Sequence, residues 1–349
     1  MKNNHLIFKY IVLFLFVCFF SCETGKNMTV DELKEKYSLE ELEELYQIKQ
    51  DTSTFSITKY NKQLYEENNF IKSDTIKEAL KVIYGPDDRL DFYQEQNAER
   101  VKNAMGVVAL VWKWDLVQDD SGMYKLNTKN FGTSQNLCST EKFSSQPVGA
   151  FCSGFAVNQN TIVTAGHCFK IDSELEDIRF IFGYKLNTIN NVNITFSPEA
   201  IFSAKRLISK KLDNGRGKDY AIIETNEQIP PSHILLLTSN TKIADNEEVY
   251  VIGHPVGLPL KIAGGANVRD NSNVDYFIAN LDTYGGNSGS PIFNSQTNKV
   301  EGILVRGEVD FKSQGECNVS NPCPNTGCRG EDVTRVSQFK EFLISEAIQ

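Results

Sequence analysis

From about residue 105 onward, the sequence predicts an all-β fold of antiparallel barrels or sandwiches. Short apolar segments recur in this part of the chain, and Gly, Asn and Asp residues separate them. These segments are GVVALVW from Gly106, NTIVTAGHC from Asn160, IRFIFGY from Ile178, YAIIET from Tyr220, EEVYVIGHP from Glu247 and VEGILVRG from Val300. One helix is expected at the end of the chain, from about Val336 to Ala347.

Size and charge bound the possible functions. The chain has 349 residues, enough for about two compact units. Its hydrophobic content of 40% and charged content of 23% are typical of a globular protein with a buried core. The net charge of −9 argues against a nucleic-acid partner, because phosphate binding requires a basic surface. No stretch after the N-terminal segment is apolar enough to span a membrane.

The N-terminus is typical of an export signal. Lys2 and Lys9 precede an apolar run over residues 10–20, which ends at Ser21 and Cys22. The stretch resembles a bacterial lipoprotein signal, which implies that Cys22 is the lipidated first residue; the alternative is ordinary cleavage nearby with an unmodified Cys22. A single lipid would anchor the chain without making it span the membrane. We therefore expect a protein of the bacterial cell envelope, or a secreted one.

Cysteine usage agrees with export. Cys18 is removed with the signal, and Cys22 is the candidate for lipidation. Six cysteines remain: Cys138, Cys152, Cys168, Cys317, Cys323 and Cys328. An even number in an exported chain indicates disulfides. A metal site in the last three is the alternative, but their spacing matches no zinc pattern and no histidine lies near them, so we expect neither metal nor cofactor.

The segment after the signal, residues 23–81, is charged and predicted to be helical. Residues 38–41 have the form of a capping box, in which the Ser38 hydroxyl and the Glu41 carboxylate each accept a backbone N–H. The apolar residues that follow, Leu39, Leu42, Leu45 and Tyr46, share one helical face. A second helical stretch covers residues 74–82. We interpret 23–81 as a pro-segment or stalk, and 82–104 as a linker to the remainder of the chain.

Three stretches each contribute one polar group suited to nucleophilic catalysis. TIVTAGHC places His167 after a β-like run, GKDYAII places Asp219 before an apolar strand, and GGNSGSP presents Ser288 among small residues. A serine hydroxyl becomes a good nucleophile only when a base removes its proton. Histidine is the natural base near neutral pH, and a carboxylate on its other nitrogen fixes the tautomer.

The glycines before Ser288 suggest a site for a developing oxyanion. They allow the backbone N–H groups of Gly286 and Ser288 to point at one position, and one such donor contributes about 3–4 kcal/mol to the rate. Taken singly, a lone His is usually structural, an Asp before a strand is usually a turn residue, and a Gly-rich loop is usually a connection. The order His, Asp, Ser on three strand-like segments of an exported β-rich chain is much more specific.

Over residues 105–349 the chain resembles the trypsin-like serine proteases, on the motifs TAGHC and GNSGSP. The resemblance implies an all-β fold of two six-stranded antiparallel barrels with a C-terminal helix, the site lying between the barrels. The first barrel would cover 105–235 and the second 236–349. The resemblance also implies a disulfide between Cys152 and Cys168, which would stabilise the fold by about 3 kcal/mol. EDVTRVSQF, from Glu331, resembles the last strand before the C-terminal helix.

Two features resemble the bacterial branch that contains the glutamyl endopeptidases. Asn287 stands where the digestive enzymes carry Asp, and VIYGPDDR, residues 82–89, is similar to the mature N-terminus of that branch. In the digestive enzymes the freed amino terminus pairs with that Asp. A neutral Asn287 cannot supply the buried counter-charge, so we expect activation without this ion pair.

The resemblance also indicates which residues line the specificity pocket. Asp282, six positions before Ser288, would lie at the pocket floor and select Arg or Lys; alternatively it is a solvated turn residue. Thr283 is compatible with basic or acidic substrates. Glutamyl endopeptidases place a histidine on the strand after the serine, and the corresponding residue here is Leu304.

Three further residues bear on the pocket. Gly307, at the end of the strand after the serine, is a further expected substrate contact. Arg306 could pair with Asp282 and mask its charge. Glu331 would add negative charge near the pocket.

The sequence therefore predicts an exported serine endopeptidase that hydrolyses peptide bonds through an acyl-enzyme intermediate, after Arg or Lys. The alternatives are glutamyl-type specificity, or a catalytically silent protease-fold module that binds partners in the cell envelope. We expect a monomer that acts on polypeptides, binds no nucleic acid and meets a membrane only through its N-terminal lipid. Cleavage between Lys81 and Val82 would release the acidic pro-segment.

Overall fold

The structure is a computed structural model that describes residues 83–213, 216–307 and 309–344. These residues belong to the second of the two units of the chain, Ser73–Gln349. The expected signal, pro-segment, both N-terminal helices and the Lys81–Val82 bond lie outside the described residues. Within the described part of the chain, no helix has the length and apolarity needed to cross a membrane.

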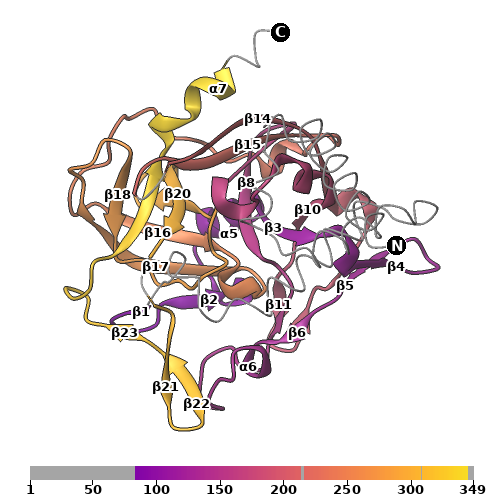
Figure 1. The fold of residues 1–349 in the computed structure, drawn as a ribbon, viewed down its shortest axis with the longest axis horizontal. Helices are drawn as coiled ribbons and strands as arrows, with labels where there is room; N and C mark the ends of the chain where they lie inside the picture. The colour runs from indigo at the N-terminus through magenta and orange to yellow at the C-terminus, as the bar shows by residue number, and fades with distance from the viewer. Residues whose placement is uncertain (1–82, 214–215, 308, 345–349) are drawn as a thin grey trace, which may run out of the picture. The chain divides into compact units, whose positions relative to one another are not determined.

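The first barrel is a closed antiparallel sheet with the strand order β10-β14-β15-β9-β8-β3 (Figure 1). Its strands are β3 (Val107–Trp112), β8 (Cys152–Asn158), β9 (Thr161–Thr164), β10 (Ile178–Phe182), β14 (Ile201–Leu212) and β15 (Asp219–Thr225). Every residue of β3 and of β9 is buried, and both strands have a hydrogen-bonded neighbour on each side in the closed sheet. The buried core on one side of this barrel consists of Ala109, Val111, Leu126, Ile181, Tyr184 and Phe196.

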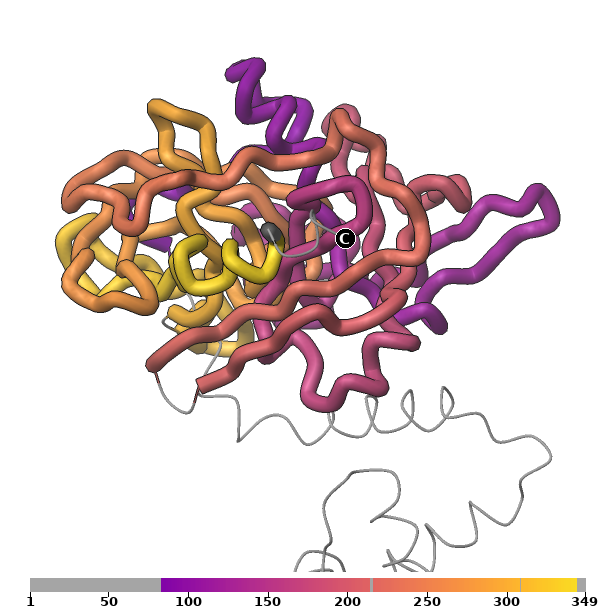
Figure 2. Tube along the Cα trace, turned by 90° about the horizontal axis from the view of Figure 1, so that it is seen from above, coloured from indigo at the N-terminus to yellow at the C-terminus, as the bar shows by residue number. Residues whose placement is uncertain are grey.

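The second barrel has the strand order β16-β19-β20-β24-β18-β17 and is closed by pairing of β16 with β17. Its strands are β16 (Glu248–Gly253), β17 (Lys261–Asp270), β18 (Tyr276–Ala279), β19 (Pro291–Asn294), β20 (Val300–Arg306) and β24 (Glu331–Arg335). The core includes Val249, Val251, Phe277, Leu281, Ile292, Leu304 and Val333. The two barrels lie side by side in both views (Figures 1 and 2). The predicted fold class, two six-stranded antiparallel barrels, is confirmed.

Residues 83–104, which we expected to form a linker, have structure of their own. β1 (Ile83–Tyr84) pairs in parallel with β23 (Pro322–Cys323), and β2 (Arg89–Asp91) pairs with β17 outside the second barrel. Helix α5 (Ala98–Ala104) follows; the side chain of its N-cap Asn97 accepts two backbone N–H groups. Strands of two or three residues are too short to show an apolar period, so the sequence did not predict them.

The remaining strands and α-helices are not part of the two barrels. They are β4 (Leu116–Gln118), β5 (Tyr124–Leu126), β6 (Lys129–Asn130), α6 (Phe131–Ser134), β7 (Pro147–Val148), β11 (Leu186–Thr188), β12 (Asn191–Val192), β13 (Thr195–Phe196), β21 (Phe311–Gln314), β22 (Cys317–Ser320) and α7 (Lys340–Ile344). The hairpin of β4 and β5 extends away from the first barrel (Figure 2). The expected C-terminal helix begins with a 3-10 turn at Val336–Gln338 and continues as α7.

Three disulfides connect the six cysteines. Cys152–Cys168 joins β8 to the turn after β9, as the resemblance implied. The other two pairings, which the sequence left open, are Cys138–Cys317 and Cys323–Cys328. The three C-terminal cysteines are therefore in disulfides and do not form the alternative metal site. Cys138–Cys317 ties the β21–β22 hairpin to the segment after α6.

Candidate active site

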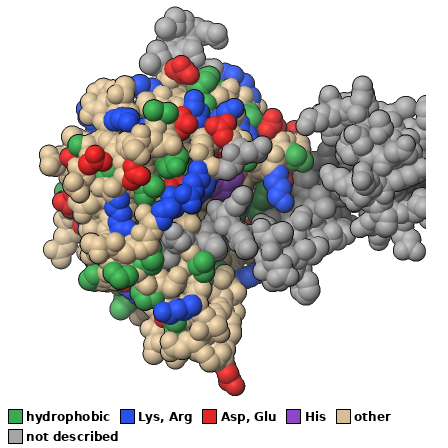
Figure 3. Space-filling model, turned by 60° about the vertical axis from the view of Figure 1, so that its left-hand side comes forward, with side chains coloured by type: hydrophobic (Ala, Val, Ile, Leu, Met, Phe, Trp, Pro, Cys, Tyr) green, Lys and Arg blue, Asp and Glu red, His purple; other side chains and the backbone are tan. Residues whose placement is uncertain are grey.

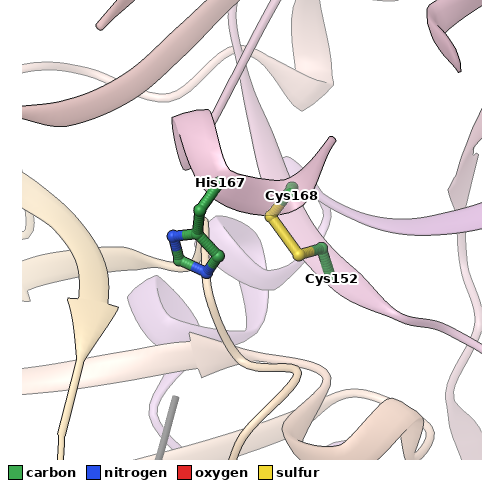
Figure 4. Close-up of side chains that lie close together, drawn as sticks. All are labelled: Cys152, His167 and Cys168. Atoms are coloured by element: carbon green, nitrogen blue, oxygen red, sulfur yellow. A yellow bond between two sulfur atoms is a disulfide. The ribbon is translucent and has the colours of Figure 1, made fainter. Parts of the chain in front are cut away.

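His167 lies in a tight turn, Gly166–Cys168, directly after β9. A Cβ atom at Gly166 would lie 2.5 Å from the carbonyl oxygen of Lys211 and 2.8 Å from that of Tyr220, so glycine lets the turn approach the β14–β15 pair. On the other side, the Cys152–Cys168 disulfide ties this turn to β8, and the His167 imidazole extends away from the sulfur atoms (Figure 4). The turn is therefore fixed from two directions, while the His167 side chain remains 28% exposed.

Asp219, the first residue of β15, binds His167 through both of its oxygens, one at the imidazole and one at the backbone. Its Oδ2 lies 2.8 Å from His167 Nδ1, and its Oδ1 accepts the His167 backbone N–H at 3.2 Å. An ionised carboxylate can only accept hydrogen bonds, so Nδ1 carries the proton and Nε2 is the acceptor. The arrangement therefore fixes the tautomer in which Nε2 is free to accept a proton.

The pKa of the Asp219 carboxyl lies below its ordinary value. Burial raises this pKa, but the hydrogen bond and charge of His167, the charge of Arg306 and the His167 backbone N–H together outweigh burial. Asp219 is therefore ionised at neutral pH although only 1% of it is exposed.

Ser288 lies in a sharp turn between two glycines in the left-handed backbone region, Gly286 (φ 77°) and Gly289 (φ 89°). A Cβ atom at Gly289 would lie 2.0 Å from the carbonyl oxygen of Ser153, so no larger residue fits against β8. The Ser153 N–H in turn donates to the Ser288 carbonyl at 2.8 Å, across the boundary between the barrels. Among the described residues, the Ser288 hydroxyl has no hydrogen-bond partner.

The backbone N–H groups around Ser288 divide into two kinds. Three of them donate: Gly285 to Asp310 Oδ2, Asn287 to the Tyr284 carbonyl and Gly289 to the Leu304 carbonyl. Those of Gly286 and Ser288 donate to no acceptor in the described part of the chain. Ser288 is buried and Gly286 is partly buried, and backbone N–H groups away from water rarely lack acceptors, so these two are available to a ligand oxygen.

Asn287 makes neutral hydrogen bonds inside the second barrel. Its Nδ2 donates to Thr283 Oγ1 at 2.5 Å, and its Oδ1 accepts from Ser290 Oγ at 2.8 Å. Within the described residues, no charged group contacts its side chain. Thr283 is fully buried and orients Asn287 through this hydrogen bond.

Asp282 faces the N-terminal segment. Its Oδ1 accepts the Tyr84 N–H at 2.6 Å, and its Oδ2 accepts the Asp88 N–H at 2.9 Å. Burial raises the pKa of its carboxyl to about 7, against the two backbone hydrogen bonds, which favour the ionised form. The carboxylate is thus neither a solvated turn group nor wholly free for a substrate.

Arg306 could have paired with Asp282 on the sequence alone, but in the structure its ion pairs are with other carboxylates. The Arg306 guanidinium lies 3.6 Å from Asp219 Oδ2 and 3.7 Å from Asp332 Oδ2. Arg306 ends β20, beside β24, whereas the Asp282 oxygens are occupied by backbone N–H groups of residues 84 and 88. Sequence spacing alone does not determine the direction of a side chain this long.

Leu304 and Gly307 are the other two residues that were expected to line the pocket. Leu304 is fully buried in the core of the second barrel. Gly307 lies against Glu331, whose Oε2 would be 1.7 Å from a Cβ atom at that position. The structure thus places the Glu331 carboxylate beside Gly307, and any larger residue at 307 would displace it.

Two buried cations, Arg89 and Lys261, to which the sequence analysis assigned no contact, hold the N-terminal segment against the second barrel. Arg89 is 1% exposed; it forms an ion pair with Asp87 at 2.7 Å and donates to the Tyr284 hydroxyl at 2.9 Å. Lys261 on β17 pairs with Asp91 at 2.6 Å, and burial lowers its pKa to about 8. The sequence signal for the first contact was the Asp-Asp-Arg run in VIYGPDDR, whose partner Tyr284 lies 195 positions away.

Cys152, His167 and Cys168 form a cluster with metal-ligand side chains, the potential ligand atoms lying within 4.8 Å of one another. Both sulfur atoms are in the Cys152–Cys168 disulfide, so neither can bind a metal as a thiolate (Figure 4). The surface view shows a histidine side chain with Lys and Arg side chains next to it (Figure 3).

Comparisons with known proteins agree with the fold. The family model described as trypsin-like peptidase domain matches residues 152–303, a range that includes His167, Asp219 and Ser288. A curated relative, secreted RxLR effector protein 73 of Plasmopara viticola, is 22% identical over 210 residues, which are 56% of this chain. The match covers 48% of that protein, so the chain spans about half the length of this relative.

Two solved structures are also similar. A Vibrio cholerae VesB protease has 17% identity and a TM-score of 0.46, over 77% of this chain and 68% of that one. A Glu endopeptidase in complex with MPD has 16% identity and a TM-score of 0.46, over 77% of this chain and 100% of that one. The family match supports a protease, and residues 152–303 of this double-barrel chain are similar to a trypsin-like peptidase domain.

Proposed function

We propose that this protein is a serine endopeptidase in which Ser288 is the nucleophile, His167 the general base and Asp219 the group that orients the base. The contact that carries the proposal is the double hydrogen bond of Asp219 to His167, which presents Nε2 as a proton acceptor. The two N–H groups without acceptors, at Gly286 and Ser288, support it further. They have the form of an oxyanion hole.

The proposed chemistry follows from these groups. His167 Nε2 takes the Ser288 proton while Oγ attacks the substrate carbonyl carbon. The carbonyl electrons move to the oxygen, which accepts hydrogen bonds from the Gly286 and Ser288 N–H groups. His167 then gives its proton to the leaving amine as the C–N bond breaks, and water hydrolyses the acyl-enzyme by the same route. Asp219 stabilises the imidazolium and keeps its own charge.

For specificity, we propose cleavage after Arg or Lys, with Asp282 and Glu331 as the acidic groups of the pocket. The position of Glu331 against Gly307 supports this preference, and Leu304 offers no cation for a substrate carboxylate. Because the pKa of Asp282 is about 7, its attraction for a basic side chain should grow as the pH rises through that value. Cleavage profiles on a peptide library at about pH 6 and pH 8 test this: a preference for Glu, or one that ignores pH, would reject the assignment of Asp282.

Reaction with a fluorophosphonate probe tests the mechanism, using the wild-type chain with Ser288→Ala as the blank. We expect the wild type to be labelled and to hydrolyse peptides, and Ser288→Ala to lose about 10⁶ in kcat. Folded wild type that neither reacts nor cleaves would favour a silent binding module.

We further propose that the protein is exported, is either secreted or attached to the cell envelope through Cys22, and acts as a monomer. The three disulfides support export, because such bonds persist in oxidising compartments. Maturation would cut the Lys81–Val82 bond. Mass spectrometry of the active enzyme tests this step, and an intact N-terminus on fully active protein would show that the cut is not needed.

A further inference from the structure

Arg306 places a cation next to the carboxylate that orients His167. Its Nη2 atom lies 3.6 Å from Asp219 Oδ2 and donates to the Gly217 carbonyl at 3.1 Å. Its Nη1 atom lies 3.7 Å from Asp332 Oδ2. The side chain is only 14% exposed, so water screens these contacts weakly. Asp219 therefore lies between the imidazole of His167 and the guanidinium of Arg306.

We propose that Arg306 is a positioning residue that holds the Asp219 carboxylate toward His167 and extends the activity of the enzyme to lower pH. This inference rests on the function proposed above, because it assigns a role within the same site. The guanidinium cannot lose its proton in a protein, so its charge is permanent.

The effect on His167 follows from the sign of the charges. When the imidazole takes up a proton it becomes a second cation next to Asp219, and Arg306 already neutralises part of that carboxylate. The protonated imidazole is therefore less stable than it would be beside Asp219 alone. His167 then remains the neutral base to a lower pH, at the expense of some stabilisation of the imidazolium during the reaction.

Charged groups on the neighbouring elements do not duplicate this role. On β14, Lys210 interacts with Asp219 only electrostatically; its ammonium donates to the Phe169 carbonyl at 2.8 Å. On β24, Asp332 lies on the far side of Arg306 and also binds the Arg329 guanidinium. Within the described residues, the ion-pair contacts of Asp219 are those with His167 and with Arg306.

The pair Arg306 and Arg329 provides a matched control. Both guanidinium groups contact Asp332, but an ion-pair contact with Asp219 is found only for Arg306 in the described part of the chain. Arg306→Gln and Arg329→Gln thus each remove one cation from Asp332, and only the first removes one from Asp219. Any effect that comes from Asp332 and β24 alone would appear in both variants.

The test compares the full chain with Arg306→Gln, Arg306→Lys and Arg329→Gln in two measurements. The first is the acid limb of the pH profile of kcat/KM. The second is the NMR titration of the His167 ring in a Ser288→Ala background, assigned with His167→Ala. For Arg306→Gln we expect both midpoints to move up by about 0.5–1 pH unit. Arg306→Lys should restore most of the shift, and Arg329→Gln should leave both midpoints in place.

The NMR measurement separates this inference from the proposed function, because it needs no turnover. An unmoved His167 titration in Arg306→Gln, or an equal shift in Arg329→Gln, would overturn the role of Arg306 even in an active peptidase. If Arg306→Gln shifts the His167 titration but the wild-type chain cleaves no peptide, the electrostatic coupling of Arg306 to His167 would stand and the peptidase function would be rejected. Arg306→Met, which keeps the aliphatic stem, replaces Arg306→Gln if that variant does not fold.

Discussion

The two halves of the candidate site are held in place by different kinds of contact. His167 and Asp219 belong to the first barrel, where β9 and β15 are adjacent antiparallel strands and a disulfide closes a separation of 16 residues. The loop before Ser288 is attached to the N-terminal segment: Asp282 to Tyr84 across 198 positions, and Tyr284 to Arg89 across 195. The histidine half is organised by its own barrel together with the Arg306 contact from β20, and the serine half depends on a distant segment.

This difference indicates where the site can be switched. Ordering residues 83–91 against the second barrel costs backbone entropy of about 1–2 kcal/mol per residue, which the buried contacts of Arg89, Asp91 and Tyr84 have to offset. The segment directly follows the proposed cleavage point at Lys81–Val82. The serine half of the site is therefore the half that maturation of the N-terminus could affect, whereas the histidine half has no such contact among the described residues.

The largest effect should come from the histidine half. Asp219→Asn leaves the shape of the side chain but removes the charge and reverses the preferred tautomer of His167, so we expect kcat to fall by about 10⁴. Steady-state hydrolysis of a peptide substrate measures it. Asp213→Asn, in the nearby turn where Asp213 pairs with Lys211, is the control and should change kcat less than about twofold. A loss below about tenfold for Asp219→Asn would remove Asp219 from the mechanism.

The next effect tests the dependence of the serine half on the N-terminal segment. Arg89→Met removes the buried cation of Asp87 and the Arg89 hydrogen bond to Tyr284, while Lys142 and Ser320 remain as their partners, so we expect the free energy of unfolding to fall by about 3 kcal/mol. Urea unfolding measures it. Lys102→Met, in the exposed pair with Glu99, is the control at about 0–0.5 kcal/mol.

The same variant has a second readout at the active site. If Tyr284 transmits the N-terminal contact to Ser288, Arg89→Met should also lower kcat/KM under conditions where the protein is still folded. Unchanged kcat/KM together with reduced stability would show that the serine loop keeps its shape without the segment, and the contrast between the two halves would disappear.

The sequence was informative where structure is local. Apolar runs such as IRFIFGY became β10, and the motifs around His167 and Ser288 led to the fold class and to the candidate groups. Gly286 could be interpreted because a backbone that turns an N–H group toward one position next to Ser288 favours glycine, and its φ is 77°. The Cys152–Cys168 pairing followed from resemblance over a short separation.

Contacts between distant segments were not predictable from the same information. Nothing in a two-residue strand such as Ile83–Tyr84 indicates that it pairs with Pro322–Cys323. The direction of the Arg306 side chain, and the occupation of Asp282 by backbone N–H groups, depend on how loops meet after both barrels have formed. The spacing of residues in a motif predicts which residue types lie at a site. It does not predict which distant group a long or buried side chain contacts.

The smallest of these effects, the pH dependence of Asp282, probes the serine half most directly. The pKa of its carboxyl is about 7 in the folded protein and about 3.8 in the unfolded chain, so the folded state binds the proton more tightly. As the pH rises from about 3.8 to about 7, the Asp282 carboxyl loses its proton in the unfolded chain but keeps it in the folded protein. The contribution of Asp282 to the free energy of unfolding therefore falls with rising pH. From about pH 4.5 to pH 7.5 the loss amounts to about 3 kcal/mol, and Asp282→Asn abolishes it.

Urea unfolding of the wild type and Asp282→Asn at the two pH values measures this difference. Asp119→Asn gives a control of opposite sign, because the hydrogen bond from the Ser121 hydroxyl, followed by those from the Ser121 and Met123 backbone, holds the pKa of Asp119 below its ordinary value. A wild-type minus Asp282→Asn difference that stays constant with pH would mean that the Tyr84 and Asp88 N–H groups keep Asp282 ionised throughout. The N-terminal segment would then be fastened to the serine loop by a permanent charge, and the pocket would carry that charge at every pH tested.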